Sequence, residues 1–224
     1  MPATEAARLG PRLAAVQGLL DDGFGIVLDI GCDHGDLVVA LGAAGRPAVG
    51  VELRPHLVAA LRDRGAAAVL GDGFRCAAGG WLGGQQAVLA GLGEERILAI
   101  LERDRERARR CRRVILCPST RRGGLRPALA TQGWRILDED LVERAGRWYE
   151  VLAITTGTEP AQGAELLVGP RLIATRHPCL PAFLDAQLAL PAATGSRAPA
   201  YRAWIDACRA VRARQASGRE RRPV

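Results

Sequence analysis

Two glycines and three acidic residues stand close together near the start of the chain. Residues 29–36 read DIGCDHGD and follow a short apolar run, so we expect them to form the turn from a strand into a helix. Glycine in such a turn lets the backbone bend sharply and come close to a ligand. An acid before the first glycine, here Asp29, disfavours a pyrophosphate and suits an ammonium group. The turn therefore indicates a site for a methionine-like ligand.

Two more acidic residues stand where the next two apolar runs end. Glu52 comes 21 positions after Gly31, the separation expected for a carboxylate that receives ribose hydroxyls. Asp72, followed by Gly73, ends the third run, where an acid can accept a hydrogen bond from an adenine amine. Each acid by itself could be a helix cap. Together with Asp29, at these spacings, they favour an adenosyl ligand.

The elements that must position these acids are indicated by alternating patterns. Short runs that are apolar on both faces, separated by amphipathic stretches, are typical of parallel strands covered by helices on both sides. An earlier helical spacing covers 4–20, with Pro11 as a bend. We therefore predict an α/β fold with a doubly wound, mostly parallel sheet. Its expected strands are 26–30, 48–51, 67–70, 87–90 and 114–116, and its helices are 36–44, 55–64, 94–111 and 124–132.

The sheet is expected to end in an antiparallel hairpin. The β-rich runs 134–142 and 148–155 are joined by only five residues, too few for a parallel crossover. A parallel sheet closed by one hairpin is the architecture of the common methyltransferases.

Helical patterns return after the hairpin, at 181–190 and 199–215. We divide the chain into a methyltransferase domain (1–158), a small helical hairpin domain (163–218) and a basic tail (219–224).

Positive charge is concentrated in the second half of the chain. All 31 basic residues are arginine; residues 1–100 carry 8 of them against 11 acids, and residues 101–224 carry 23 against 13. This asymmetry fits a polyanion held on one side of the molecule, although a solvated surface without such a partner explains it equally well. The arginines that we expect to contact phosphates are Arg121, Arg122, Arg126, Arg202, Arg209 and Arg212.

Cysteine spacing and hydropathy indicate the compartment. The six cysteines are scattered without a Cys-x-x-Cys pair, so we expect no metal site and interpret them as small buried side chains in a reducing compartment. No apolar run approaches the length of a membrane span. Residues 1–12 lack the apolar core of a signal peptide. These features predict a cytoplasmic protein without a membrane partner.

Five short blocks resemble the bacterial tRNA (adenine-N1)-methyltransferases that modify an adenine at the base of the D arm. In the family's order they are 29–34 (DIGCDH), 71–73 (GDG), 90–93 (AGLG), 148–152 (WYEVL) and 167–170 (LVGP). The resemblance runs from about Leu9 to the end of the chain. It implies a class I, Rossmann-like methyltransferase fold, S-adenosylmethionine as methyl donor, and N1 of an adenine in tRNA as acceptor.

The resemblance also implies roles for individual residues. Because N1 of neutral adenine has a free lone pair, the reaction needs mainly alignment and exclusion of water. We assign Leu92 and Asp33 to catalysis, Asp33 as a carboxylate that stabilises the cationic product; the alternative for Asp33 is a turn-capping residue without substrate contact. Arg12 is interpreted as a solvated helix arginine, the alternatives being a contact with the cofactor carboxylate or with an RNA phosphate. For His34 the alternative is a helix-start residue without cofactor contact. The implied cofactor contacts are Asp29, Gly31, Asp33 and His34 for the methionine portion, Glu52 for the ribose, Asp72 and Gly73 for the adenine, and Gly91 beside the methyl group.

Three departures from the family pattern leave other functions open. Glu94 stands where the family usually has the last glycine of Gly-Met-Gly-Gly, and residues 117–119 read CPS instead of Gln-Pro-Asn. The C-terminal helices are expected to be shorter than the family's long pair. The alternatives are a methyltransferase for another RNA position or a small molecule, and a non-catalytic module that binds S-adenosylmethionine or RNA.

Overall fold

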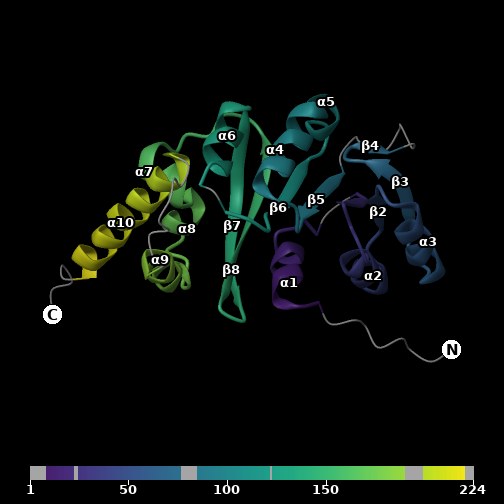
Figure 1. The fold of residues 1–224 in the computed structure, drawn as a ribbon, viewed down its shortest axis with the longest axis horizontal. Helices are drawn as coiled ribbons and strands as arrows, with labels where there is room; N and C mark the ends of the chain where they lie inside the picture. Colours follow the sequence, from purple (N-terminus) through teal and green to yellow (C-terminus); the bar gives the residue numbers. More distant parts are fainter. Residues whose placement is uncertain (1–8, 23–24, 77–84, 122, 190–198, 220–224) are drawn as a thin grey trace.

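One mixed eight-stranded sheet forms the centre of the computed structural model, which describes residues 9–22, 25–76, 85–121, 123–189 and 199–219 (Figure 1). The strand order is β4-β3-β2-β1-β5-β6-β8-β7. The five central strands are parallel, β4 and β8 are antiparallel to their neighbours β3 and β6, and β7 is antiparallel to β8. The strands are β1 (Val27–Ile30), β2 (Ala48–Glu52), β3 (Ala68–Asp72), β4 (Arg75–Cys76), β5 (Gln86–Ala90), β6 (Arg113–Cys117), β7 (Trp134–Arg144) and β8 (Arg147–Thr156).

Helices cover both faces of this sheet, as Figure 1 shows. Side chains alternate along a strand, so Val88 packs in the core that contains Val16 and Leu37, whereas its neighbour Leu89 packs with Ile97 on the opposite face. Apolar burial on both faces is what the predicted strand pattern requires. One face carries α1 (Pro11–Gly18), α2 (Asp36–Ala43) and α3 (Pro55–Asp63), and the other carries α4 (Glu94–Arg103), α5 (Arg105–Ala108) and α6 (Leu125–Thr131).

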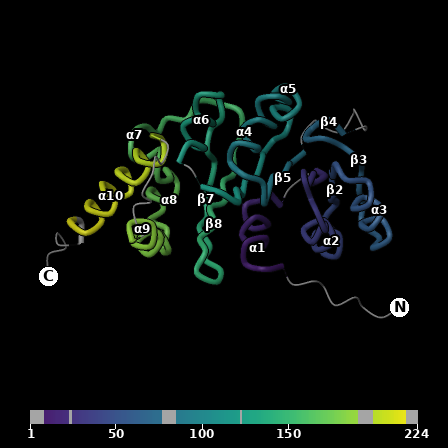
Figure 2. The backbone as a smooth tube through the Cα atoms, viewed as in Figure 1, coloured from purple at the N-terminus to yellow at the C-terminus, as the bar shows by residue number. Residues whose placement is uncertain are grey.

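Four further helices gather at the end of the sheet next to the hairpin. They are α7 (Gly163–Val168), α8 (Pro170–Ala174), α9 (Leu180–Ala189) and α10 (Pro199–Arg219), and Figure 2 shows them at the end of the molecule opposite α2 and α3. Phe183 and Trp204 form a third core with Leu141 of β7, and Trp148 of β8 packs against it. Aromatic side chains bury large apolar areas, so this core holds the helices against the hairpin.

The predicted doubly wound sheet and its antiparallel hairpin are confirmed, with three local differences. The helix expected at 94–111 is two helices, because Asp104 leaves the helical conformation at φ −108° and ψ 25°. Pro11 is not a bend but begins α1, since the first turn of a helix does not need the missing N–H of proline. The expected C-terminal helical hairpin contains α7 and α8 in addition. Residues 4–8, part of the predicted first helix, and 220–224, most of the predicted tail, lie outside the described residues.

Parallel pairing brings the ends of five strands to one edge of the sheet. Ile30 pairs with Val51, Glu52 with Leu70, and Ala90 with Cys117, so the turns that follow these strands are neighbours. Ligands of doubly wound sheets bind at this carboxyl edge. Within the described ranges, no helix is both long enough and apolar enough to cross a membrane.

Candidate functional site at the carboxyl edge of the sheet

The turn after β1 has a strained and closely packed backbone. Gly31, Asp33 and Gly35 have φ values of +73°, +53° and +70°, a region that glycine enters freely and aspartate more readily than most residues. The N–H of Gly31 donates to the carbonyl of Val51 at 2.8 Å. A Cβ added at Gly35 would lie 2.1 Å from a methyl carbon of Leu61. The glycine pattern is therefore required by the geometry of the turn.

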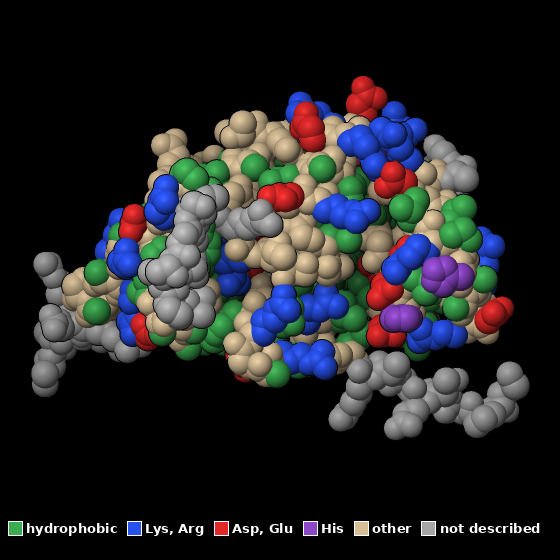
Figure 3. Space-filling model, in the orientation of Figure 1, with side chains coloured by type: hydrophobic (Ala, Val, Ile, Leu, Met, Phe, Trp, Pro, Cys, Tyr) green, Lys and Arg blue, Asp and Glu red, His purple; other side chains and the backbone are tan. Residues whose placement is uncertain are grey.

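A cavity of about 460 Å³ opens beside this turn, within the range of small-molecule sites. Two arginines that the sequence analysis did not assign to the cofactor, Arg12 and Arg54, contribute to its wall. In Figure 3, acidic, basic and histidine side chains lie next to one another over α2 and α3. Six predicted site residues line the cavity: Asp29, Gly31, Asp33, His34, Gly91 and Leu92.

Asp29 is a buried acid at the base of this cavity wall. It is the third of the four buried residues of β1 and is 5% exposed. Burial raises the pKa of its carboxyl to about 7, while the Arg12 cation lowers it and the Glu52 carboxylate raises it further. A ligand ammonium would favour the charged form of Asp29 and remove much of the cost of burying it. Asp29 is thus suited to hold a cation.

Arg12 reaches the same cavity from α1. Its guanidinium lies over the Tyr149 ring, 6.0 Å from the centroid. Its Nη1 atom is buried and has no hydrogen-bond partner among the described residues, and it would lie 3.6 Å from a Cβ at Gly91. The structure favours the alternative of a contact with the cofactor carboxylate over a solvated arginine, because α1 packs against the sheet and directs this side chain into the cavity. A buried donor without a partner fits a ligand carboxylate, so Arg12 and Asp29 together suit the zwitterion of an amino acid.

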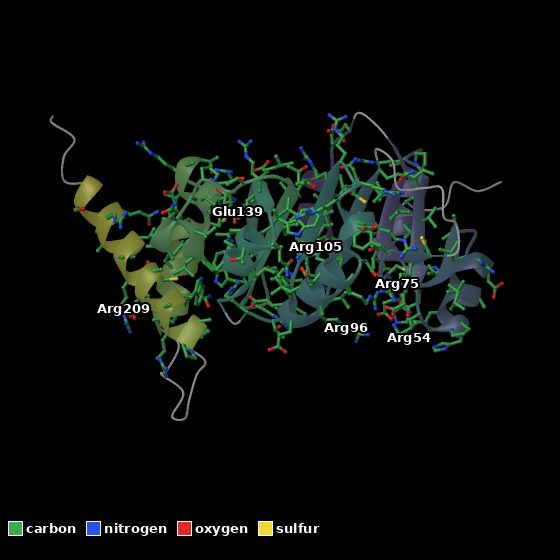
Figure 4. All side chains as sticks on the ribbon, turned by 90° about the horizontal axis from the view of Figure 1, so that it is seen from above. Arg54, Arg75, Arg96, Arg105, Glu139 and Arg209 are labelled. Atoms are coloured by element: carbon green, nitrogen blue, oxygen red, sulfur yellow. The ribbon has the colours of Figure 1, made fainter. Side chains whose placement is uncertain are left out.

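Glu52 is buried and covered by Arg54. Its carboxylate accepts hydrogen bonds from the backbone N–H groups of Asp33, Leu53 and Arg54 at 3.1, 3.0 and 3.0 Å, and from Nε of Arg54 at 2.9 Å. Burial acts to raise the pKa of Glu52, but the bonds from the Arg54 side chain and from the backbone outweigh it and lower that pKa. A ribose can therefore reach the Glu52 carboxylate only after the Arg54 guanidinium has moved away from it. Figure 4 shows Arg54 at the same end of the molecule as Arg75.

Asp33 and His34 form the exposed rim of the turn. Nη2 of Arg54 donates to Oδ1 of Asp33 at 2.9 Å, and Nε2 of His34 lies 3.9 Å from Oδ2 of the same carboxylate. More than half of each side chain, Asp33 and His34, is accessible to solvent. Both can therefore contact a ligand in the cavity without a change in the core.

Asp72 and Gly73 lie outside this cavity. Nη1 of Arg103 donates to Oδ2 of Asp72 at 2.7 Å, and Nη2 of the same guanidinium donates to Asp104 at 2.7 Å. A Cβ at Gly73 would lie 2.5 Å from that guanidinium. The carboxylate expected to receive the adenine amine is engaged by Arg103, at the end of α4, so the assignment of Asp72 and Gly73 to adenine remains a prediction.

The loops after β5 and β6 are tied together on the other side of the cavity. The N–H of Ser119 donates to the carbonyl of Leu92 at 2.8 Å, and the side chain of Leu92 lies 3.6 Å from a Cβ position at Gly31. Glu94 follows in sequence but is buried and faces a small separate cavity that Arg126 and other side chains line. Its carboxylate therefore does not contribute to the cofactor cavity.

Arg126 cannot contact a phosphate, and its prediction as an RNA contact is wrong. Its side chain is 6% exposed and lies between Glu139, at 2.7 Å, and Glu150, at 2.8 Å. Buried charges need partners of opposite sign, and these two carboxylates from β7 and β8 supply them.

Among the described residues there is no group of three His, Cys, Asp or Glu side chains that could hold a metal ion.

Arg121 is also committed to the protein interior, which corrects its prediction as a phosphate contact. Its Nε donates to Glu150 and its Nη1 donates to Gln187 of α9 at 3.2 Å. The guanidinium stacks on Phe183 and Trp204, at 4.8 and 5.4 Å from their centroids. Arg121 thus joins the loop after β6 to the C-terminal helices. Arg122 lies outside the described residues.

The three predicted arginines of α10 differ in accessibility. Arg212 makes a two-pronged ion pair with Asp185 of α9, at 2.6 and 2.9 Å. Arg209 pairs with Asp206 one turn away and is exposed, and Figure 4 shows it at the far end of the molecule from Arg54. Arg202 is exposed as well. Arg202 and Arg209 can reach an RNA, whereas Arg212 mainly joins two helices.

The family profile described as a methyltransferase domain matches residues 9–152. A Streptococcus pneumoniae structure, assigned as a tRNA (m1A22) methyltransferase in complex with S-adenosyl-L-methionine, is similar with a TM-score of 0.74 and 24% identity, over 92% of this chain and 100% of that one. The structure of Bacillus subtilis TrmK, an M1A22 tRNA methyltransferase, has a TM-score of 0.68 and 20% identity, over 92% of this chain and 99% of that one. M. capricolum TrmK in complex with S-adenosyl-homocysteine has a TM-score of 0.63 and 17% identity, over 92% of this chain and 97% of that one. No curated protein matches the sequence.

Proposed function

The chain belongs to the methyltransferase-domain family, and from this premise we propose that it transfers a methyl group from S-adenosylmethionine to N1 of an adenine in tRNA. The observation that carries the proposal is that the buried acid Asp29 and the partly buried Arg12, whose Nη1 atom is buried without a hydrogen-bond partner among the described residues, line one cavity at the carboxyl edge. The likeness in fold to proteins named as tRNA (m1A22) methyltransferases extends over 92% of the chain, beyond the 9–152 match. A cytoplasmic location follows from a tRNA substrate.

In this proposal the methionine portion, the ribose and the methyl group of the cofactor each have a protein partner, and the adenine keeps its predicted assignment to Asp72 and Gly73. Asp29 binds the ammonium and Arg12 the carboxylate of the methionine portion, since the buried carboxyl of Asp29 and the buried Nη1 donor of Arg12 each offer the opposite charge. Glu52 binds the ribose hydroxyls after Arg54 has released it. When bound, S-adenosylmethionine supplies an electrophilic methyl group on a sulfonium sulfur. Gly91 and Leu92 line the path to that methyl group.

The protein has little proton chemistry to perform on this acceptor. N1 of neutral adenine attacks through its own lone pair, so no general base is required. Leu92 excludes water from the gap, and alignment of the reacting atoms supplies much of the rate increase. Asp33 stabilises the positive charge of the product adenine, a role in which it must exchange its bond with Arg54 for the substrate. The target base leaves its stack at a cost of about a few kcal/mol.

Transfer of tritiated methyl groups to unmodified bulk tRNA, followed by nucleoside analysis, tests this function. Label in 1-methyladenosine supports it. Label in another nucleoside, or only in a small molecule, overturns the acceptor and retains a methyltransferase. Binding of S-adenosylmethionine without any transfer identifies a non-catalytic module, and the absence of binding in calorimetry contradicts the cofactor as well.

A further inference from the structure

A second cleft, of about 280 Å³, lies next to the cofactor cavity. Its walls come from three parts of the chain: the loop after β6, the β7–β8 hairpin and helix α9. The cleft lies between the methyltransferase sheet and the C-terminal helices. The residues that matter for its chemistry are Ser119, Arg121, Arg147, Trp148, Glu150 and Gln187.

Two contacts connect this cleft to the cofactor cavity. Ser119, in the cleft, donates its N–H to the carbonyl of Leu92, in the cavity, at 2.8 Å. Arg147, in the cleft, and Arg12, in the cavity, both lie over the ring of Tyr149, at 5.2 and 6.0 Å from its centroid. The cleft is therefore adjacent to the part of the cofactor cavity, beside Leu92, in which we place the methyl acceptor.

Arg147 is the exposed cation of this cleft. Its side chain is exposed, donates one hydrogen bond to the carbonyl of Ser119 and stacks on Tyr149. A guanidinium has five N–H donors, so donors remain for a further acceptor. The other arginine of the cleft, Arg121, is paired with the buried carboxylate of Glu150. Positive charge at the mouth thus comes from Arg147.

Trp148 supplies an aromatic wall of the same cleft. Its indole is partly exposed and lines the cleft, while its position is held by an edge contact with Phe183 at 5.7 Å and 73°. Unstacked bases of RNA bind on aromatic side chains, and guanidinium groups bind phosphates. Consecutive residues of a strand point to opposite faces, but Arg147 and Trp148 both line this cleft at the end of the hairpin. A cation and an aromatic wall in one cleft are suited to one nucleotide of a single-stranded segment.

We propose that this cleft binds the nucleotide next to the target adenine, with its phosphate at Arg147 and its base against Trp148. The proposal rests on the proposed function, because it places the target adenine in the gap beside Leu92. When an adenine is turned out of its stack, the phosphate that joins it to its neighbour must pass close to that gap. Phosphate contacts of this kind position the RNA rather than read its sequence.

The dinucleotide ApA and the nucleoside adenosine separate this cleft from the cofactor cavity. Both are titrated into protein saturated with S-adenosyl-homocysteine, and binding is followed by tryptophan fluorescence. Wild-type protein should bind ApA at least tenfold more tightly than adenosine. Arg147→Ala should reduce this advantage to less than threefold, and Trp148→Phe should remove most of the fluorescence change. Arg105→Ala is the matched control. Arg105 is an exposed arginine on α5, and α5 leads into the start of β6, at the edge of the sheet opposite to the cleft.

Methyl transfer to tRNA completes the test. Arg147→Ala should raise the KM for tRNA about tenfold more than Arg105→Ala does, with unchanged affinity for S-adenosyl-homocysteine. Equal effects of Arg147→Ala and Arg105→Ala on the KM for tRNA, or equal affinities of wild-type protein for ApA and adenosine, would overturn the proposal that the cleft binds a nucleotide. A wild-type protein that methylates tRNA in either of those cases keeps the proposed function. If wild-type protein methylates no RNA, the proposed function fails, and a lost ApA advantage in Arg147→Ala still supports a nucleotide site.

Discussion

Nε of Arg54 lies 2.9 Å from a carboxylate oxygen of Glu52, so the acid that the sequence assigns to the ribose is covered by a guanidinium. The cover is hydrogen-bonded to Asp33 as well, and the Arg54 side chain is 52% exposed. The carboxylate of Glu52 is buried but keeps three backbone N–H donors when Arg54 leaves, so ribose hydroxyls that take the place of the half-exposed guanidinium can offset the loss of the ion pair. Occupation of the cofactor site and release of Arg54 should therefore be coupled.

Arg54→Gln should bind S-adenosyl-homocysteine a few times more tightly than the wild type, because no ion pair has to be broken first. Glu52→Gln should bind it at least tenfold more weakly, since the ribose loses a charged acceptor. Isothermal calorimetry measures both affinities. Weaker binding by Arg54→Gln would contradict the covering role and assign Arg54 to the ligand itself.

Affinity for S-adenosyl-homocysteine should fall about tenfold between pH 8 and pH 6. The ligand ammonium requires ionised Asp29, whose pKa burial raises to about 7 in the free protein, and below that pKa each unit of pH removes up to tenfold of the ionised form. Calorimetry across this range measures the slope. Asp29→Asn should bind weakly at every pH; an unchanged slope in this variant would show that another group titrates.

The stability of the ligand-free protein should also depend on the ionisation of Asp29, but in the opposite direction: ligand affinity rises with pH, whereas this contribution to stability falls with pH. The folded pKa of Asp29 lies above the unfolded value of 3.8, so the folded state binds the extra proton. Its contribution to the free energy of unfolding is fully present below about pH 4 and is lost as pH rises through 7. Urea titrations of wild type and Asp29→Asn should diverge over this window, with the variant less dependent on pH.

Arg126→Ala should lower the free energy of unfolding by about 3–5 kcal/mol, because Glu139 and Glu150 would be left as buried carboxylates without their shared cation. Chemical denaturation measures this loss. Arg105→Ala, an exposed residue paired with Glu102, serves as the control and should change it by less than about 1 kcal/mol. A stable Arg126→Ala protein with weakened RNA binding would restore the phosphate contact that the structure excludes.

Gly35→Ala should disrupt the cofactor turn, whereas Gly45→Ala should be tolerated. Both glycines have φ near +70°, so both substitutions meet the same backbone strain of about 1–2 kcal/mol. Only at Gly35 does the new Cβ also meet Leu61, at 2.1 Å; nothing lies within 4 Å of the one at Gly45. Thermal unfolding should show a larger loss for Gly35→Ala, together with loss of S-adenosyl-homocysteine binding. Equal losses would mean that Leu61 moves aside freely.

The carboxyl-edge site could be predicted from local patterns. Runs that are apolar on both faces indicate parallel strands, and parallel strands must end at the same edge, so Asp29 and Glu52 could be placed together without coordinates. The glycine turn predicted Gly31 beside the ligand and the family resemblance implied Gly91, and both line the cavity. The five-residue link at 143–147 required a hairpin, which the structure contains.

The surroundings of each arginine could not be predicted in this way. Arg12 was expected in solvent and is directed into the cavity, while Arg126 was expected at a phosphate and is buried. An arginine looks the same in sequence whether its partner is water or a carboxylate. The partners here are 13 residues away, for Arg126 and Glu139, and 66 away, for Arg121 and Gln187.

Periodicity and spacing thus determined the sheet, its hairpin and the acidic edge, because these depend on hydrophobic burial and chain connectivity over short stretches. Only the tertiary structure decided which cations remain available to a ligand. Packing of α1 and of the C-terminal helices brings distant charges together, and a buried charge is stable only where such a partner meets it.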